Sequence, residues 1–179
     1  MRSLKLIEIT GNLWEYIGEA DCICITTNGF VKKNGEAVMG KGCAKQALTR
    51  YPDIGLRLGT MLKNEGNKPV ELYQDSGTRI WSFPVKPRTV PYLLEGQNVV
   101  EHMRNKFKKD DMVPGWAAKA CINLILQSAA ILQKYADSNK WESVIIPRPG
   151  CGAGELNWDY VSSKLHPLLD DRFKTITYR

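Results

Sequence analysis

The sequence predicts a single α/β domain with a mixed, largely parallel sheet covered by helices on both faces. Two observations carry this prediction. Helical patterns alternate with short strand patterns along most of the chain, and some of the strands are apolar almost without interruption, as in buried parallel sheets. A length of 179 residues suits one such domain with a sizeable core and is short for two. We therefore expect residues 1–179 to form one domain with three layers, α/β/α.

The strands are predicted from alternation and from apolar runs. Alternating apolar and charged residues predict a first strand over about Leu4–Ile9. The run Cys22-Ile23-Cys24-Ile25 predicts a buried strand over Asp21–Thr27 and would place Cys22 and Cys24 on the same side of it. The other expected strands are Val70–Tyr73, Arg79–Phe83, Ser143–Pro147 and Thr175–Tyr178.

Helices are predicted between these strands. The longest covers about Lys119–Ala136 and carries an apolar stripe that includes Ile125 and Leu132. Pro52 and Asp53 separate two helices earlier in the chain. The other expected helices are Cys43–Tyr51, Ile54–Asn64 and Trp158–Leu169.

The segment Pro87–Trp116 interrupts this alternation. It is longer than an ordinary connection between a strand and a helix. It contains basic residues beside two acidic ones: Arg104, Lys106, Lys108, Lys109, Asp110 and Asp111. The segment is either an insertion or functional flap at about 87–116, or a solvated surface helix with a mixed-charge face.

Composition restricts the class of protein. A net charge of +6 and a pI near 9.1 indicate a positive field that attracts polyanions, without choosing between nucleic acid, a nucleotide and simple solubility. No apolar run approaches the roughly 20 residues of a membrane span, and the N-terminus lacks the pattern of a signal peptide. The five cysteines form no CxxC pair and only two histidines are present. We therefore expect a cytoplasmic monomer with reduced thiols, no metal, no cofactor and no membrane partner.

The first glycine-rich loop precedes a predicted helix. The stretch Gly35–Lys41 resembles a P-loop, but Gly42 stands where a Ser or Thr would hold magnesium, which excludes a nucleoside triphosphatase. Gly40 and Gly42 let backbone amides approach an anion beside a helix N-terminus. The loop is a candidate phosphate site, and a plain turn that begins a helix is the alternative.

The second glycine-rich loop, Pro147–Trp158, follows a buried strand. Gly150, Gly152 and Gly154 form a second nest of backbone amides. A dinucleotide fingerprint would follow the first strand of the fold, so this late position argues against a Rossmann domain. Two phosphate-binding loops at one edge of a sheet would suit a diphosphate.

Four motifs, taken together and in this order, resemble the macrodomain family. They are Gly11-Asn12-Leu13, Thr26-Thr27-Asn28, Met39-Gly40-Lys41-Gly42 and the loop Pro147–Trp158. The nearest likeness is to the branch that contains a bacterial antitoxin acting on ADP-ribosylated DNA and an animal relative acting on acidic side chains. The resemblance implies a macrodomain that binds ADP-ribose or an ADP-ribosylated macromolecule, nucleic acid among the candidates. It also implies hydrolysis of the glycosidic bond to the target.

The resemblance assigns binding residues to this chain. Asn12 and Leu13 would flank the adenine, and Asn28 would contact the distal ribose. The two glycine loops would enclose the diphosphate and the distal ribose. The residues implied there are Met39, Gly40, Lys41, Gly42, Cys43, Ala44, Gly150, Cys151, Gly152, Ala153, Gly154 and Leu156.

The resemblance also assigns catalytic residues. Phe83-Pro84-Val85-Lys86 matches the family's Phe-Pro-x-Lys context, which implies Lys86 as a catalytic residue. Its amine could stabilise the leaving base, or attack once desolvation lowers its pKa. Glu155 could act as an acid or base, or cap the following helix. Gly154 stands where the animal relative has an aspartate, which favours the DNA-directed branch.

Two other functions would use the same loops. A non-catalytic ADP-ribose reader would bind the ligand without stabilising a transition state. A phosphatase acting on ADP-ribose 1″-phosphate would need a base or nucleophile at the distal phosphate, and neither His102 nor His166 lies in these loops.

Overall fold

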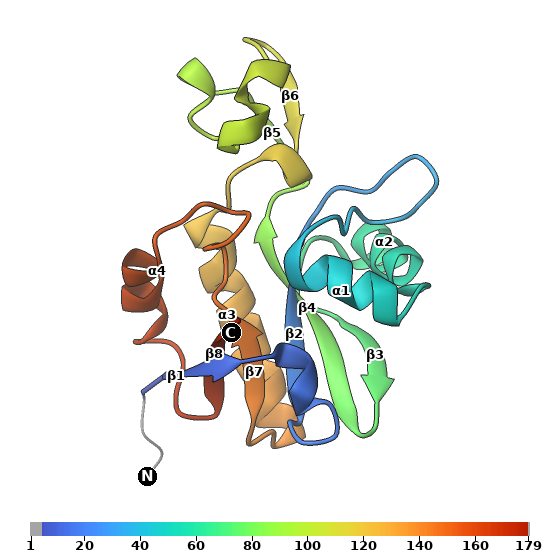
Figure 1. The fold of residues 1–179 in the computed structure, drawn as a ribbon, viewed down its shortest axis with the longest axis vertical. Coiled ribbons are helices and arrows are strands. Elements are labelled where there is room, and N and C mark those ends of the chain that lie inside the picture. Colours follow the sequence, from blue (N-terminus) through green and yellow to red (C-terminus); the bar gives the residue numbers. More distant parts are fainter. Residues whose placement is uncertain (1–4, 179) are drawn as a thin grey trace.

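The computed structural model describes residues 5–178, which form a six-stranded sheet between helices (Figure 1). The strand order is β1-β8-β7-β2-β4-β3, and β3 alone in this sheet runs antiparallel to its neighbour. The mixed, largely parallel sheet predicted from the sequence is confirmed. The strands are β1 (Ile7–Gly11), β2 (Cys22–Asn28), β3 (Glu71–Asp75), β4 (Thr78–Lys86), β7 (Val144–Pro147) and β8 (Phe173–Tyr178).

Two strand boundaries differ from the prediction in a way that matters for the site. Leu4, the expected start of the first strand, lies outside the described residues, and β1 begins at Ile7. Strand β4 continues three residues past Phe83 to Lys86, because its parallel pairing with β2 continues across a register shift to Asn28. Lys86 is therefore the last residue of an interior strand of the sheet, paired with β2 on one side and β3 on the other.

Helices cover both faces of the sheet, α1 and α2 on one and α3 and α4 on the other (Figure 1). Their bounds are α1 (Gly42–Arg50), α2 (Ile54–Glu65), α3 (Ile122–Asn139) and α4 (Trp158–Leu165). Helix α3 begins later than predicted because its N-cap residue, Cys121, has an extended backbone. Helix α4 ends earlier than predicted: His166 keeps helical backbone angles, but the proline at 167 has no N–H with which to continue the helical hydrogen bonds. Among residues 5–178, no helix is both long and apolar enough to cross a membrane.

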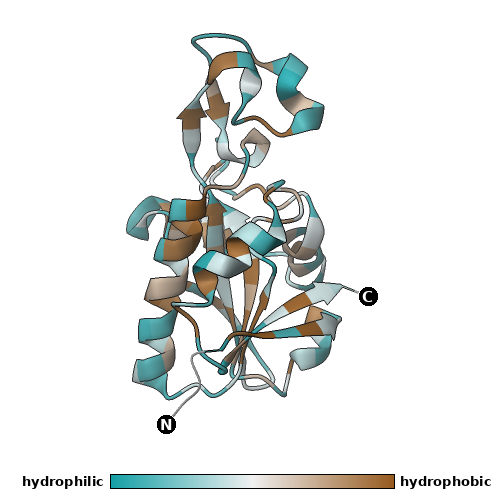
Figure 2. Ribbon diagram, turned by 90° about the vertical axis from the view of Figure 1, so that its left-hand side faces the viewer, coloured by the Kyte–Doolittle hydropathy of each residue, from teal (hydrophilic) through white to brown (hydrophobic). Residues whose placement is uncertain are grey.

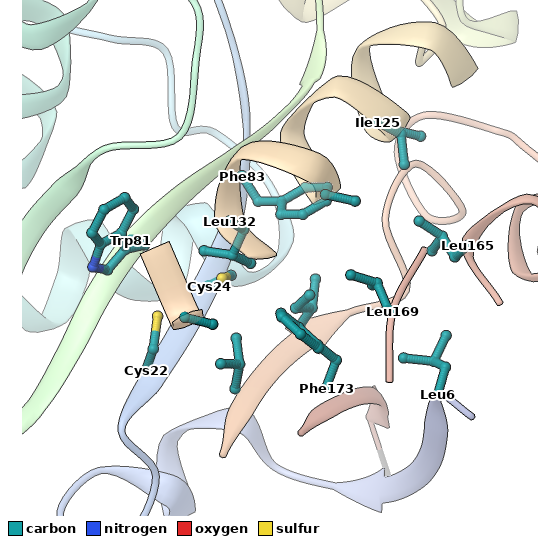
Figure 3. Close-up of a cluster of buried hydrophobic side chains, with 14 of the residues drawn as sticks. Leu6, Cys22, Cys24, Trp81, Phe83, Ile125, Leu132, Leu165, Leu169 and Phe173 are labelled. Carbon is teal, nitrogen blue, oxygen red and sulfur yellow. The ribbon is translucent and has the colours of Figure 1, made fainter. Parts of the chain in front are cut away.

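The core is divided between the two faces of the sheet. Along β2, Cys22 and Cys24 pack with α3 and α4, while Ile23 and Ile25 pack with α1 and α2. This alternation follows from the two-residue period of a strand and confirms that the two cysteines share a face. Figure 3 shows the first cluster, in which Phe83 lies among side chains from the helices. Because helices cover both faces of β2, its residues Cys22–Ile25 are apolar at every position.

Residues 87–118, which we call the lobe, project beyond the carboxyl end of β4 (Figures 1 and 2). Its elements are β5 (Thr89–Pro91), η2 (Leu94–Gly96), η3 (Glu101–Lys106), β6 (Met112–Pro114) and η4 (Gly115–Ala117), where η denotes a 3₁₀ helix. Strands β5 and β6 pair in antiparallel orientation. The lobe also has its own small hydrophobic cluster, which includes Val99, Val113 and Ala117. The segment is therefore not a single surface helix.

Candidate functional site

A pocket of about 1000 Å³ opens at the carboxyl ends of the parallel strands. The last residue of each of these strands lies on its wall: Gly11, Asn28, Lys86, Pro147 and Tyr178. Loops leaving that edge, including both glycine loops, complete the wall. The volume is at the upper end of the range of about 300–1,000 Å³ usual for small-molecule sites. This is where ligands bind in open α/β sheets.

The first glycine loop is held in place by Asn28. Its side-chain amide donates to the carbonyl of Val38 over 3.0 Å, and its carbonyl oxygen accepts from the backbone N–H of Phe30 over 2.9 Å. The loop then leads into α1, whose N-cap residue, Lys41, makes no capping hydrogen bond with its side chain. The first amides of α1 therefore remain available to an anion at the pocket wall.

The glycines of the two loops fall into two groups. A Cβ at Gly154 would lie 2.6 Å from the Cβ of Ala120, and Gly150 has a φ of +77°, so the fold itself requires glycine at both positions. At Gly40 and Gly152, a Cβ would meet no described atom within 4 Å beyond the adjacent chain. Both line the pocket. Packing of the described residues does not require glycine there, and the missing side chains leave room for a ligand.

Lys86 brings an amine to the same wall. The residue is only 7% exposed, and its Nζ donates to the backbone carbonyl of Trp116 over 3.3 Å. Burial lowers the pKa of Lys86 to about 8, the nearby charge of Lys41 adds to this, and Glu155 opposes it. Near neutral pH the amine is thus mostly charged but close to its titration point, as acid–base catalysts commonly are.

Glu155 does not line the pocket, although its charge is close enough to act on Lys86. Its carboxylate accepts from the backbone N–H of Glu101 over 3.0 Å and lies 4.0 Å from Nζ of Lys119. It does not cap α4 either, because Asn157 accepts from Tyr160 N–H in that role. Glu155 therefore joins the second glycine loop to the start of η3 in the lobe.

The first glycine loop makes a corresponding contact with the lobe. Nζ of Lys41 lies 3.2 Å from Nε2 of His102, the residue after Glu101 in η3. Both glycine loops thus contact the same end of η3, although one loop precedes the lobe in the sequence and the other follows it. The lobe is held over the loops by side-chain contacts as well as by its covalent attachment.

Two cysteines line the pocket without suitable reactivity. Burial raises the pKa of the Cys43 thiol and raises that of Cys151 to about 11. Both are therefore thiols near neutral pH, and the thiolate is the nucleophilic form. Within residues 5–178, no group of three His, Cys, Asp or Glu side chains is arranged to hold a metal ion.

Most of the residues assigned from the sequence meet at this pocket, and two do not. Lys86, Leu13, Asn28 and every assigned residue of the two glycine loops lie on its wall. Glu155 does not, as described above. Asn12 does not either, because its side chain accepts from Trp14 N–H over 3.0 Å and caps the 3₁₀ helix η1 (Leu13–Tyr16).

The sequence analysis missed several aromatic and basic residues of the wall. Trp158 donates a hydrogen bond from Nε1 to the carboxylate of Glu8 over 2.7 Å. The guanidinium of Arg148 lies 5.0 Å from the centre of the Trp158 ring. Trp116 and Tyr178 also line the pocket. The signal was available for Arg148 and Trp158, since both lie within the second glycine loop, Pro147–Trp158.

Comparison with known proteins identifies the fold. No family model and no curated protein matches the sequence. Solved structures match over nearly the whole chain. The macrodomain of Mycobacterium tuberculosis DarG is 22% identical with a TM-score of 0.62, and the match covers 96% of this chain and 99% of that one. The macrodomain of Thermus aquaticus DarG is 18% identical with a TM-score of 0.64, covering 97% of each chain.

A third structure extends the likeness to a protein solved with a ligand. Thermosipho africanus DarTG, in complex with ADP-ribose, is 17% identical with a TM-score of 0.66. The match covers 99% of this chain and 43% of that longer one. Together these comparisons show that residues 5–178 have the three-layer macrodomain fold, as the sequence motifs predicted.

Proposed function

We propose that the pocket binds ADP-ribose and that the chain hydrolyses the glycosidic bond joining ADP-ribose to a modified target. The observation that carries the proposal is a buried amine, Lys86, on the same wall as two loops whose glycines at 40 and 152 are not required by packing. The fold shared with an ADP-ribose complex of DarTG supports the identity of the ligand.

The wall offers a place for each part of ADP-ribose. Backbone amides of the two loops, with Arg148 nearby, would hold the diphosphate. Leu13 would lie against the adenine, and the side chain of Asn12, engaged in its cap, would leave only its backbone to the ligand. Asn28 and Lys86 are partners in the register of β2 and β4, so the distal ribose would lie between them.

The reaction needs a proton for the leaving atom. Water adds to the anomeric carbon as the glycosidic bond breaks, and the bonding electrons leave with the nitrogen or oxygen of the target. The ammonium of Lys86 donates a proton to that atom, and the proton of the attacking water is lost to solvent. Held by its diphosphate, the sugar would be positioned for an oxocarbenium-like transition state. A pKa of about 8 keeps Lys86 mostly protonated at neutral pH and still able to give its proton up.

Replacing Lys86 tests the proposal directly. Lys86→Ala should leave the affinity for ADP-ribose nearly unchanged and lower turnover by about 10²- to 10⁴-fold, since the amine acts mainly as the bond breaks. Lys86→Arg should be similarly inactive, because guanidinium does not release a proton near neutral pH. The measurements are calorimetric titration with ADP-ribose and release of ADP-ribose from modified DNA, RNA and protein.

The matched control is Lys134→Ala, which removes an exposed lysine on α3 outside the pocket. It should turn over like the wild type. Equal rates in the wild type and both Lys86 variants would remove Lys86 from the mechanism. Binding of ADP-ribose without release from any substrate would identify a reader instead.

A further inference from the structure

Gln46 brings an amide to one end of the pocket wall. It lies in the second turn of α1, where this helix meets the 3₁₀ helix η1, and it is exposed. The indole Nε1 of Trp14 donates a hydrogen bond to Oε1 of Gln46 over 2.8 Å. Trp14 directly follows Leu13, which lines the same pocket. Gln46 and Leu13 therefore lie at the same end of the pocket.

The bond from Trp14 fixes which way the Gln46 amide faces. An indole N–H can only donate, so its partner has to be the amide oxygen and not the amide nitrogen. Trp14 itself is only 9% exposed and belongs to the hydrophobic cluster beneath α1, so packing holds its ring in place. Within residues 5–178, the amide nitrogen of Gln46 donates no hydrogen bond to the protein. The pocket wall thus presents a pair of N–H donors in a fixed orientation.

Gln46 and Lys86 lie at opposite ends of the pocket. Leu13 follows β1, the edge strand of the sheet, whereas Lys86 ends β4, and three strands lie between these two. The backbone amides that would hold the diphosphate begin α1, and Gln46 is one turn further along that helix. A ligand whose distal ribose reaches Lys86 therefore brings its base to Gln46.

The side chain that the sequence assigned to the adenine is not free for this contact. Asn12 lies outside the pocket wall, and its side-chain oxygen accepts from Trp14 N–H as the cap of η1. Leu13 offers an apolar side chain, which suits the face of a base and not its edge. Asn28, another amide on the wall, already donates from its nitrogen to Val38. Gln46 therefore has a hydrogen-bonding capacity that these three residues lack.

We propose that Gln46 determines the base specificity of the pocket by donating a hydrogen bond from its amide nitrogen to N1 of the adenine of ADP-ribose. This inference rests on the proposed function and adds a specificity residue to it. The base is joined to its ribose through N9, and N1 lies across the ring, so N1 points away from the diphosphate. Adenine N1 accepts a hydrogen bond, whereas guanine and hypoxanthine carry a hydrogen on N1 and would meet the amide donor to donor.

The test compares two ligands that differ at one ring atom. One is ADP-ribose, and the other is its 1-deazaadenine analogue, in which a C–H group replaces N1 and accepts no hydrogen bond. Neither ligand carries a target to be released, so the wild-type protein can be titrated with both by calorimetry. ADP-ribose should bind about five- to tenfold more tightly than the analogue, the effect expected of one ordinary hydrogen bond.

Substitutions at Gln46 should remove this preference. Gln46→Leu removes the donor, so the ratio of the two affinities should fall to about one while the analogue binds as before. Gln46→Glu keeps an oxygen for Trp14 and places a second oxygen where the N–H groups were, so the ratio should again be lost. The matched control, Thr49→Glu, adds the same charge at an exposed position of α1 outside the pocket wall and should leave the ratio unchanged.

Trp14 acts through Gln46, as a positioning residue. Trp14→Phe keeps a ring in the hydrophobic cluster and removes the indole N–H, which frees the amide of Gln46 to rotate. The ratio of affinities should then lie between the values of the wild type and Gln46→Leu. A purely structural role of Trp14 would instead change the affinities for both ligands by the same factor.

Three results would overturn the inference and leave the proposed function standing. Equal binding of both ligands by the wild type would mean that N1 is not recognised. A preference that survives in Gln46→Leu would assign N1 to another donor. A Gln46→Leu variant that binds both ligands more weakly by the same factor would make the side chain a packing support. If neither ligand binds the wild type, the proposed function fails as well.

Discussion

The charge of Lys86 is costly to bury, and this cost can be measured as a change in the free energy of unfolding. Its side chain is almost wholly buried, and burial lowers its pKa from the ordinary 10.5 to about 8. The folded-state pKa is therefore lower than the unfolded one. Below about pH 8 both states carry the charge and the folded state bears the full cost of burying it. As the pH rises from 8 to 10.5 the folded protein loses this proton first, and the cost disappears.

The magnitude follows from the pKa difference. One pKa unit corresponds to about 1.4 kcal/mol, so the buried charge costs about 3 kcal/mol at neutral pH. Lys86→Met keeps most of the length of the side chain and removes the charge, but also loses the hydrogen bond to Trp116, worth about 1 kcal/mol. We expect Lys86→Met to be inactive and about 2 kcal/mol more stable than the wild type at pH 7.

The assay is urea unfolding of both proteins at pH 7 and pH 10. The advantage of Lys86→Met should shrink by about 2.5 kcal/mol between the two, because the wild type has lost the buried charge at the higher pH. Other groups that titrate in this range are common to both proteins and cancel in the difference. Lys134→Met, at an exposed lysine, should show little change in stability at either pH. A stability difference at position 86 that does not depend on pH would refute the reasoning.

Three further predictions concern the pocket and the lobe. If Lys86 donates a proton, kcat should fall as the pH rises through about 8, whereas a rise over the same range would indicate attack by the neutral amine. Gly152→Leu should abolish calorimetric binding of ADP-ribose without lowering Tm, while Gly154→Ala should lower Tm because its Cβ would clash with Ala120. Replacing the basic residues of the lobe, Arg104, Lys106, Lys108 and Lys109, by glutamates should weaken binding to an ADP-ribosylated oligonucleotide and flatten its salt dependence, with free ADP-ribose bound as before. An unchanged salt dependence would mean that these four residues are an ordinary solvated surface.

The sequence predicted those features that depend on local pattern. The apolar run of β2 predicted a buried central strand because both faces of that strand contact helices. The two glycine loops could be located because each follows the pattern of a backbone nest. Neither prediction needed knowledge of distant residues.

Features that depend on partners far along the chain could not be predicted in this way. The sequence left Glu155 as a possible acid, base or cap, and its actual partner is the backbone of Glu101 in a different segment. The side chain of Asn12 caps η1, a 3₁₀ helix too short to give a periodic signal. Trp116 passed unnoticed as a site residue because its position beside Lys86 depends on how the lobe folds back.

The contacts from Lys41 to His102 and from Glu155 to Glu101 link the two glycine loops, which are distant in the chain, through the lobe. A ligand whose diphosphate draws the two loops together would also strengthen their contacts with the lobe, and by linkage the effect is reciprocal. If binding of ADP-ribose stabilises these two contacts by some factor, the contacts raise the affinity for ADP-ribose by the same factor. Hydrogen exchange at the first amides of η3 should therefore change when the proposed phosphate site is occupied, although η3 does not line the pocket.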